Sequence, residues 1–169
     1  MTTAMLPIRR FPDPFLKQST RHVERVDDNV RRFIDTLIHT MRRHSRCVGL
    51  AAPQVGSELR IAVMDSSGHP KAETSQGLIV LVNPQVTLAE GAVIQREGCL
   101  SIPDLTANVR RAARVRLIAF DQDGSRREWS LEGFEAIIAQ HEIDHLDGKL
   151  FLDRVASQTT DVFRRKTSL

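Results

Sequence analysis

The chain has 169 residues, a length that predicts one domain over residues 1–169 with a sizeable hydrophobic core. Hydrophobic residues make up 41% of the sequence, but no apolar run approaches the ~18 residues of a membrane-spanning helix. The N-terminus lacks the basic-then-apolar pattern of a secretion signal. Two cysteines in different contexts do not indicate a disulfide framework. We therefore expect a cytoplasmic protein without a membrane partner.

The formal net charge is +3, and most of the 24 basic residues are arginines in short clusters. We interpret most of these clusters as solvated surface. No aromatic residues are interleaved with them, as base stacking on RNA would require. Contact with RNA or the ribosome is expected to be weak and salt-sensitive, through backbone phosphates. No tight protein partner is predicted. The clusters include Arg9–Arg10, Arg31–Arg32, Arg42–Arg43, Arg110–Arg111 and Arg164–Lys166.

The first part of the chain predicts an extended arm followed by an amphipathic helix. Pro7, Pro12 and Pro14 oppose an early helix within residues 1–26. A helix over about 28–44 is predicted next, with Asp27 or Asp28 as its N-cap. Its apolar residues recur at helical spacing: Val30, Phe33, Ile34, Leu37, Ile38 and Met41.

The middle of the chain predicts strands. Runs of apolar and β-branched residues indicate strands over 59–65 and 78–84, separated by a polar loop. Alternation predicts a half-buried strand over 115–119, and the turn after it leads to a partner strand at about 126–131.

A second helix is predicted near the C-terminus, and it determines the expected fold. Phe134, Ile137, Ile138, His141 and His145 fall on one helical stripe, so both histidines should face the core. Together, the elements predict an α+β fold in which mixed or antiparallel sheets wrap around this central, metal-binding helix.

The segment His141-Glu142-Ile143-Asp144-His145 is the strongest chemical signal in the chain. Residues four apart share a helix face, so both imidazoles can bind one metal ion. The carboxylate of Glu142 is then placed to act as a base toward the attacking water. The motif alone also occurs as an ordinary polar helix face, so a third ligand is needed.

The third ligand is predicted upstream of the motif. Metallopeptidases with this motif take a Glu or a His downstream, but no Glu follows Glu142 and no His follows His145. Cys99 is the candidate, because a thiolate binds borderline-soft divalent ions strongly. A buried, apolar cysteine is the alternative reading.

The segments Gly49–Gln54, Glu97–Ser101 and His141–His145 occur in an order and spacing that resembles the peptide deformylase family. The resemblance runs from about Phe11 to Asp153. It implies a hydrolase that removes the formyl group from the N-formylmethionine of nascent polypeptides and releases formate. This is a step of N-terminal methionine processing in protein biosynthesis.

The resemblance also implies the site residues. Cys99, His141 and His145 would hold one divalent ion, Fe²⁺ in the cell, although the donors also accept Zn²⁺, Ni²⁺ and Co²⁺. Glu142 would be the base, and the Gln54 amide and the Leu100 backbone N–H would bind the oxyanion. Residues implied in substrate binding are Val48, Gly49, Phe134, Ile137 and Ile138.

Three further residues carry expectations. Glu97 and Arg111 are candidates to support the metal ligands, because a ligating histidine usually donates its second N–H to a carboxylate. Cys47 departs from the family pattern, which usually has glycine there. Strand alternation predicts that it points away from the pocket, pairs with no cysteine and has a modest packing role.

Two rival functions stay open. One is a metallopeptidase, favoured by the histidine motif alone. The other is a divergent member of the family that binds metal and has weak activity, because Cys47 would narrow the substrate groove.

Overall fold

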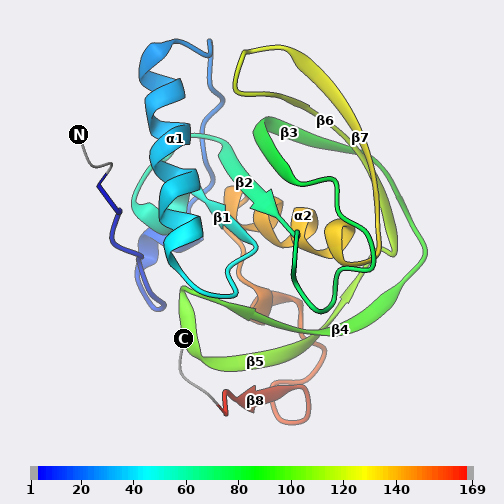
Figure 1. Ribbon diagram of the computed structural model, residues 1–169. Coiled ribbons are helices and arrows are strands. Elements are labelled where there is room, and N and C mark those ends of the chain that lie inside the picture. The colour runs from blue at the N-terminus through cyan, green and yellow to red at the C-terminus, as the bar shows by residue number, and fades with distance from the viewer. Residues whose placement is uncertain (1–3, 167–169) are drawn as a thin grey trace.

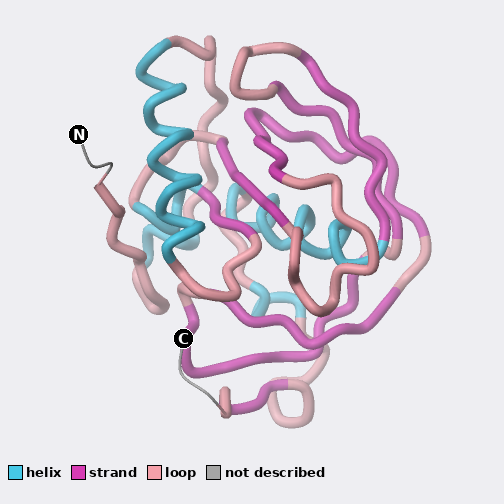
Figure 2. Tube along the Cα trace, in the orientation of Figure 1, coloured by secondary structure: helices cyan, strands magenta, loops and turns pink. Residues whose placement is uncertain are grey.

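The structure is a computed structural model that describes residues 4–166 (Figures 1 and 2). No helix in this range is long and apolar enough to cross a membrane. The α-helices are α1 (Asp28–Arg43) and α2 (Gly133–Leu146). The strands are β1 (Gly49–Ala51), β2 (Ile61–Asp65), β3 (Leu78–Glu90), β4 (Val93–Cys99), β5 (Ile102–Arg111), β6 (Arg114–Phe120), β7 (Arg126–Glu132) and β8 (Val162–Arg164). Short 3₁₀ helices span Pro14–Lys17, Ala52–Val55 and Phe151–Arg154.

Helix α1 confirms the predicted amphipathic helix. The carboxylate of Asp27 accepts a hydrogen bond from the backbone N–H of Val30 at 2.9 Å and so caps the first turn. The apolar stripe is buried, with Ile34 and Leu37 fully inaccessible, and it packs against residues of β1, β2 and β3. The helix therefore covers one face of the sheet that carries β1.

The predicted strands are all present, but their bounds differ. Strand β3 runs on to Glu90, well beyond residue 84, because its second half pairs with β6 at the exposed end of the sheet. The segment Gly49–Gln54 is a strand only as far as Ala51, since Pro53 begins a 3₁₀ helix with its neighbours.

Strands β4 and β5 were missed by the sequence reading. Strand β4 carries Arg96 and Glu97 in its middle, and β5 carries Pro103 near its start, so neither shows a continuous β-rich run. The two strands pair with each other, and their apolar side chains form a small core with Leu16 and Phe151.

Two antiparallel sheets enclose α2. One has five strands in the order β1-β2-β3-β6-β7, and the other has three in the order β4-β5-β8. Figure 1 shows α2 within the curve of the larger sheet, with β4, β5 and β8 below it. Apolar side chains of α2 pack with those of β2, β3, β6 and β7. The predicted α+β class, with antiparallel sheets wrapped around the motif helix, is confirmed.

The C-terminal end of α2 is fixed by the N-terminal arm. Gly148 follows the helix with φ of +75°, and a Cβ there would lie 2.6 Å from the carbonyl oxygen of Lys17. Thr20 donates to the carbonyl of Leu146 through both its backbone N–H (2.9 Å) and its hydroxyl (2.8 Å). Only a glycine permits this close approach, which holds the helix end in place.

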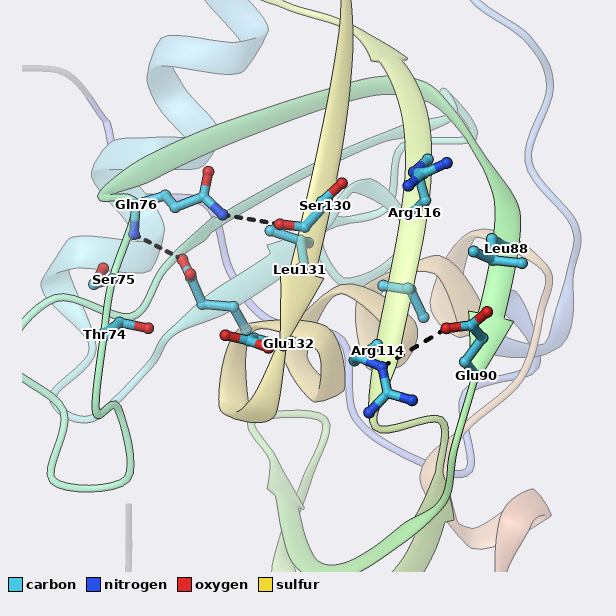
Figure 3. A pocket seen from close by; sticks show the side chains of 12 residues that line it. Thr74, Ser75, Gln76, Leu88, Glu90, Arg114, Arg116, Ser130, Leu131 and Glu132 are labelled. Carbon is cyan, nitrogen blue, oxygen red and sulfur yellow. Dashed lines mark hydrogen bonds and ion pairs between the residues drawn. The ribbon is translucent and has the colours of Figure 1, made fainter.

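A pocket of about 430 Å³ lies between the 74–76 loop and strands β3, β6 and β7 (Figure 3). The backbone N–H of Gln76 donates to Glu135 at 3.0 Å, and its side chain donates to the carbonyl of Ser130 at 3.2 Å. Neither cysteine nor histidine lines this pocket. It therefore offers no thiol and no imidazole to bind a soft metal ion.

Candidate active site

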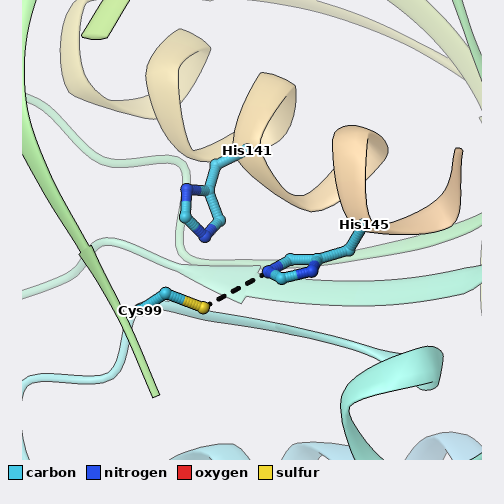
Figure 4. A group of neighbouring side chains, drawn as sticks. All are labelled: Cys99, His141 and His145. Atoms are coloured by element: carbon cyan, nitrogen blue, oxygen red, sulfur yellow. Dashed lines mark hydrogen bonds between the residues drawn. The ribbon is translucent and has the colours of Figure 1, made fainter. Parts of the chain in front are cut away.

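The structure brings Cys99, His141 and His145 together (Figure 4). One ligand atom from each lies within 4.8 Å of the others, and the Cys99 Sγ is 3.3 Å from His145 Nε2. The histidines project from one face of α2, and Cys99 faces them from the end of β4. This convergence over more than forty residues of sequence gives a donor set of one sulfur and two imidazole nitrogens.

The surroundings of this donor set fit a metal ion. Nδ1 of His141 lies 2.8 Å from Oε1 of Glu97, an arrangement that leaves Nε2 available as a ligand atom. Three protein ligands that include a thiolate are typical of catalytic sites for zinc and related divalent ions.

The three side chains also favour the ionised thiolate. Burial alone would raise the pKa of the Cys99 thiol, but His145 and His141 outweigh it and hold that pKa well below its ordinary value. Burial would lower the pKa of His141, yet hydrogen bonds with Cys99 and Glu97 raise it well above the usual value. A thiolate is the form of cysteine that binds metal.

A buried ionic network supports His141. Arg111 donates to both oxygens of Glu97, at 2.8 and 2.9 Å, and to Asp144 at 2.5 Å. Arg154 completes the network by pairing with Asp144 at 2.7 Å. Burial would raise the pKa of Glu97, but Arg111 and His141 lower it to about 2. The expectation that Glu97 and Arg111 support the ligands is confirmed.

The sequence reading missed the roles of Asp144 and Arg154 in this network. Asp144 lies inside the histidine motif, three residues after His141. Its place on the helix face of a candidate ligand was the one feature of the sequence that could have indicated its role. Arg154 lies on the 3₁₀ helix after α2 and had no such signal, because its partner is set by the fold of the chain.

Glu142 is the second acid of the site, and its pKa is shifted in the opposite direction from that of Glu97. It is 3% exposed, and its Oε1 has no hydrogen-bond partner within residues 4–166. Burial raises its pKa to about 6, despite the opposing influence of His141 and His145. A carboxylate with this pKa can accept and release a proton near neutral pH, as a general base must.

Gln54 lies beside Cys99. It is 2% exposed, and its Oε1 accepts a hydrogen bond from the backbone N–H of Ala51 at 3.0 Å, which orients the amide. Its Nε2 donates toward Cys99 Sγ at 3.4 Å and Ser101 Oγ at 3.2 Å. Leu100 follows Cys99 in the turn between β4 and β5. Both residues therefore adjoin the sulfur ligand.

A cleft of about 570 Å³ opens onto these residues. Its lining includes all five residues that the family resemblance implies in substrate binding: Val48, Gly49, Phe134, Ile137 and Ile138. Ile137 and Ile138 are buried one turn before His141, whereas Phe134 is only half-buried at the start of α2. The cleft thus joins an apolar wall to the candidate metal centre.

Cys47 lies between the core and the cleft. It packs on the cluster of α1 and β1 to β3, whereas Val48 packs on the opposite cluster with α2, as alternation predicted. Cys47 is also among the residues that line the cleft. Cys47 precedes β1, which begins at Gly49, and the thiol of Cys47 donates to the carbonyl oxygen of Gly49 at 3.2 Å. Both cysteines are free thiols.

Several cleft residues were missed from the sequence. His69, in the loop before β3, stacks on Phe134 with ring centroids 4.6 Å apart. Lys71 and Arg165 also line the cleft, from the polar loop and from the residue after β8. Neither Lys71 in a polar loop nor Arg165 near the end of the chain belongs to a sequence pattern that predicts a place in the cleft.

Comparisons with known proteins agree with this geometry. The polypeptide deformylase family profile matches residues 5–161. The chain is 40% identical over 163 residues to a peptide deformylase of Thermodesulfovibrio yellowstonii, covering 96% of each chain. It is 43% identical over 163 residues to that of Alkalilimnicola ehrlichii, covering 96% of this chain and 89% of the relative.

Solved structures give the same result for the fold. A peptide deformylase from Legionella pneumophila superposes with a TM-score of 0.83 at 38% identity, covering 90% of this chain and 87% of that one. A Met-Ala-Ser-bound class I type b peptide deformylase from Acinetobacter baumannii gives 0.84 at 31% identity, covering 91% and 100%. By its sequence and its fold, the chain belongs to the polypeptide deformylase family of hydrolases.

Proposed function

We propose that this enzyme removes the formyl group from peptides that begin with N-formylmethionine, using one divalent ion held by Cys99, His141 and His145. The observation that carries the proposal is the convergence of this donor set with Glu142 at the inner end of an apolar cleft. When bound, the ion supplies Lewis acidity to the formyl carbonyl and lowers the pKa of a water molecule beside it.

Glu142 is proposed as the general base. Its carboxylate adjoins His141 on α2 and is shielded from solvent, so it takes a proton from the attacking water at one Oε atom. The same carboxyl group then delivers that proton to the departing amine nitrogen. The bond between the formyl carbon and the amine nitrogen breaks, the formyl group leaves as formate, and the peptide gains a free amino terminus.

Gln54 and Leu100 are proposed to bind the oxyanion that develops on the formyl oxygen. The Gln54 Nε2 already donates toward the ligand sulfur, and its orientation is fixed by the bond from Ala51 to Oε1. A donor that is oriented before the reaction needs no rearrangement when charge develops. The backbone N–H of Leu100 is the second proposed donor.

The methionine side chain is proposed to lie against the apolar part of the cleft. Val48, Phe134, Ile137 and Ile138 line that part, and the two isoleucines lie one turn before the ligand His141. Gly49 is the proposed backbone contact for the peptide. The relative from Acinetobacter baumannii was solved with Met-Ala-Ser bound, which supports a site for a methionine-first peptide.

Formate release tests this function directly. The holoenzyme should release formate from formyl-Met-Ala-Ser and leave acetyl-Met-Ala-Ser and internal peptide bonds intact. Cleavage of internal bonds would favour the rival metallopeptidase. Absence of turnover with metal bound would favour a non-catalytic or weakly active family member.

The metal identity and the cellular setting belong to the same proposal. We propose Fe²⁺ as the native ion, because a thiolate with two imidazoles accepts it and the family resemblance implies it. Anaerobic reconstitution with Fe²⁺ should give a higher kcat than reconstitution with Zn²⁺. A cytoplasmic location is proposed because Cys99 must remain reduced to bind metal. Ribosome contact through the arginine clusters stays a prediction, tested by salt-dependent RNA binding.

A further inference from the structure

Four cations line the cleft outside its apolar part, and none of them forms an ion pair within residues 4–166. They come from four separate segments of the chain. We call them the basic rim: Arg46, Lys71, Arg96 and Arg165.

Three members of the basic rim, Lys71, Arg96 and Arg165, come close together. The Lys71 Nζ donates to the carbonyl oxygen of Arg96 at 3.1 Å, and the Arg96 guanidinium lies 3.6 Å from the ring centroid of Phe163 in β8. Arg165 follows two residues later, and its backbone N–H donates to Asp104 at 2.8 Å. Strand β8 pairs with β5, and the side chain of Arg165, the residue after β8, reaches Gly98 in β4.

Arg165 lies against the residue that precedes Cys99. A Cβ on Gly98 would lie 2.2 Å from Arg165 Nη2, so the guanidinium rests on the backbone of the residue before Cys99. Its Nε is buried and has no hydrogen-bond partner among the described residues. An unpaired guanidinium group in a cleft is a binding site for a carboxylate.

The acids that line the cleft do not neutralise the rim. Glu97 is bound by Arg111 and His141, and Glu142 lies buried beside Gly49. His69 stands between the cations of the rim, and burial, Lys71 and Arg46 together lower its pKa. The outer part of the cleft is therefore strongly positive.

We infer that the basic rim selects formyl-methionine peptides with a carboxylate side chain at the second or third residue. This rests on the proposed function. With the formyl group at the metal and the methionine side chain on the apolar wall, the rest of the peptide is left with the remaining lining of the cleft, which includes Gly98, Lys71 and Arg165. An acidic residue there meets unpaired cations, whereas a lysine meets like charge.

Isosteric peptide pairs test this selectivity. We expect kcat/KM for formyl-Met-Ala-Glu-Ser to exceed that for formyl-Met-Ala-Gln-Ser by roughly 2- to 5-fold at low salt, the range of exposed ion pairs. A second pair carries Glu or Gln at position two. Salt screens exposed charges. At the position where the Glu peptide is preferred, the Glu/Gln ratio of kcat/KM should therefore approach one in about 0.5 M NaCl.

Variants of the basic rim test whether Arg165 causes the preference for the acidic peptide. Arg165→Gln should bring the Glu/Gln ratio toward one, and Arg165→Glu should invert it. Arg126→Gln is the matched control, because Arg126 is exposed at the far end of β7 from α2. A ratio near one in the unaltered enzyme for both peptide pairs, or a ratio that Arg165→Gln leaves unchanged, would overturn the inference.

Binding separates this inference from the proposed function. Calorimetric titration with Met-Ala-Glu-Ser and Met-Ala-Gln-Ser should show tighter binding of the acidic peptide, whether or not formate is released. If neutral formyl peptides turn over but both product peptides bind equally, the function stands and the rim inference fails. A third outcome is that both peptides bind equally, while the protein binds RNA and Arg165→Gln abolishes that RNA binding. This result would make the basic rim a site for RNA phosphates and would overturn the inference.

Discussion

Glu142 occupies the space that a side chain at residue 49 would need. A Cβ built on Gly49 would lie 2.4 Å from Glu142 Oε2 and 2.9 Å from its Cδ. The family resemblance implies Gly49 only in substrate binding. The structure shows that it makes room for a carboxylate on the facing helix, and that β1 therefore fixes the position of Glu142.

Gly49→Ala should displace Glu142 and lower kcat/KM by roughly 10- to 100-fold, the scale of an ångström-sized misplacement. Metal content should be unchanged, because the three atoms nearest to a Cβ at residue 49 all belong to Glu142 and not to a candidate ligand. Formate release and elemental analysis on the same preparation check both parts. Full activity in Gly49→Ala would show that the carboxylate position is not critical.

The acid limb of the pH profile should follow Glu142. Burial raises its pKa to about 6, and a base works only when ionised. Its active form is therefore present above that pKa and is lost as the pH falls through it. We expect kcat/KM to decline below about pH 6, with metal content monitored at each pH. A flat profile from pH 7 to 5 with metal retained would argue against Glu142 as the base.

Arg111→Met should strongly destabilise the protein. The substitution leaves Glu97 and Asp144 as buried carboxylates without their central cation, a change that typically costs about 3–5 kcal/mol. Urea unfolding measures the loss. Arg114→Met is the matched control, because the Arg114–Glu90 pair is exposed and its loss should change stability by less than ~1 kcal/mol. Equal effects would show that the buried network contributes little.

Acid should weaken the same network. The folded state holds the pKa of Glu97 at about 2, below its ordinary value of 4.5, so its contribution is present above pH 4.5 and is lost toward pH 2. A shift of this size corresponds to stability on the order of 3 kcal/mol. Thermal unfolding of metal-free protein between pH 5 and 3 should show the decline, and Glu97→Gln should flatten it.

Cys47→Gly should preserve metal content and change kcat/KM only slightly. Burial, Glu142 and Cys99 raise the pKa of the Cys47 thiol to about 12, so it stays protonated and is a poor ligand and nucleophile. Elemental analysis and formate release measure the result. A large gain in activity would show that this side chain, which lines the cleft, obstructs the peptide.

Local patterns in the sequence were sufficient to predict the framework of the site. The apolar stripe of α1 and the histidine spacing of α2 follow from helix geometry, so both helices could be predicted. Strands β4 and β5 could not, because their stability comes from pairing with each other and not from a local run of apolar residues. The same limit applied to Arg154 and Arg165, because only the fold brings Arg154 to Asp144 and Arg165 to Gly98.

The most direct test of the catalytic account is metal content and formate release measured together on Glu142→Gln. The account predicts about one divalent ion per chain, as in the unaltered protein, with formate release nearly abolished, because Glu142 moves a proton and binds no metal. Loss of the ion in this variant would make Glu142 a ligand. Retention of near-normal turnover would show that another group acts as the base, and either result would contradict the account.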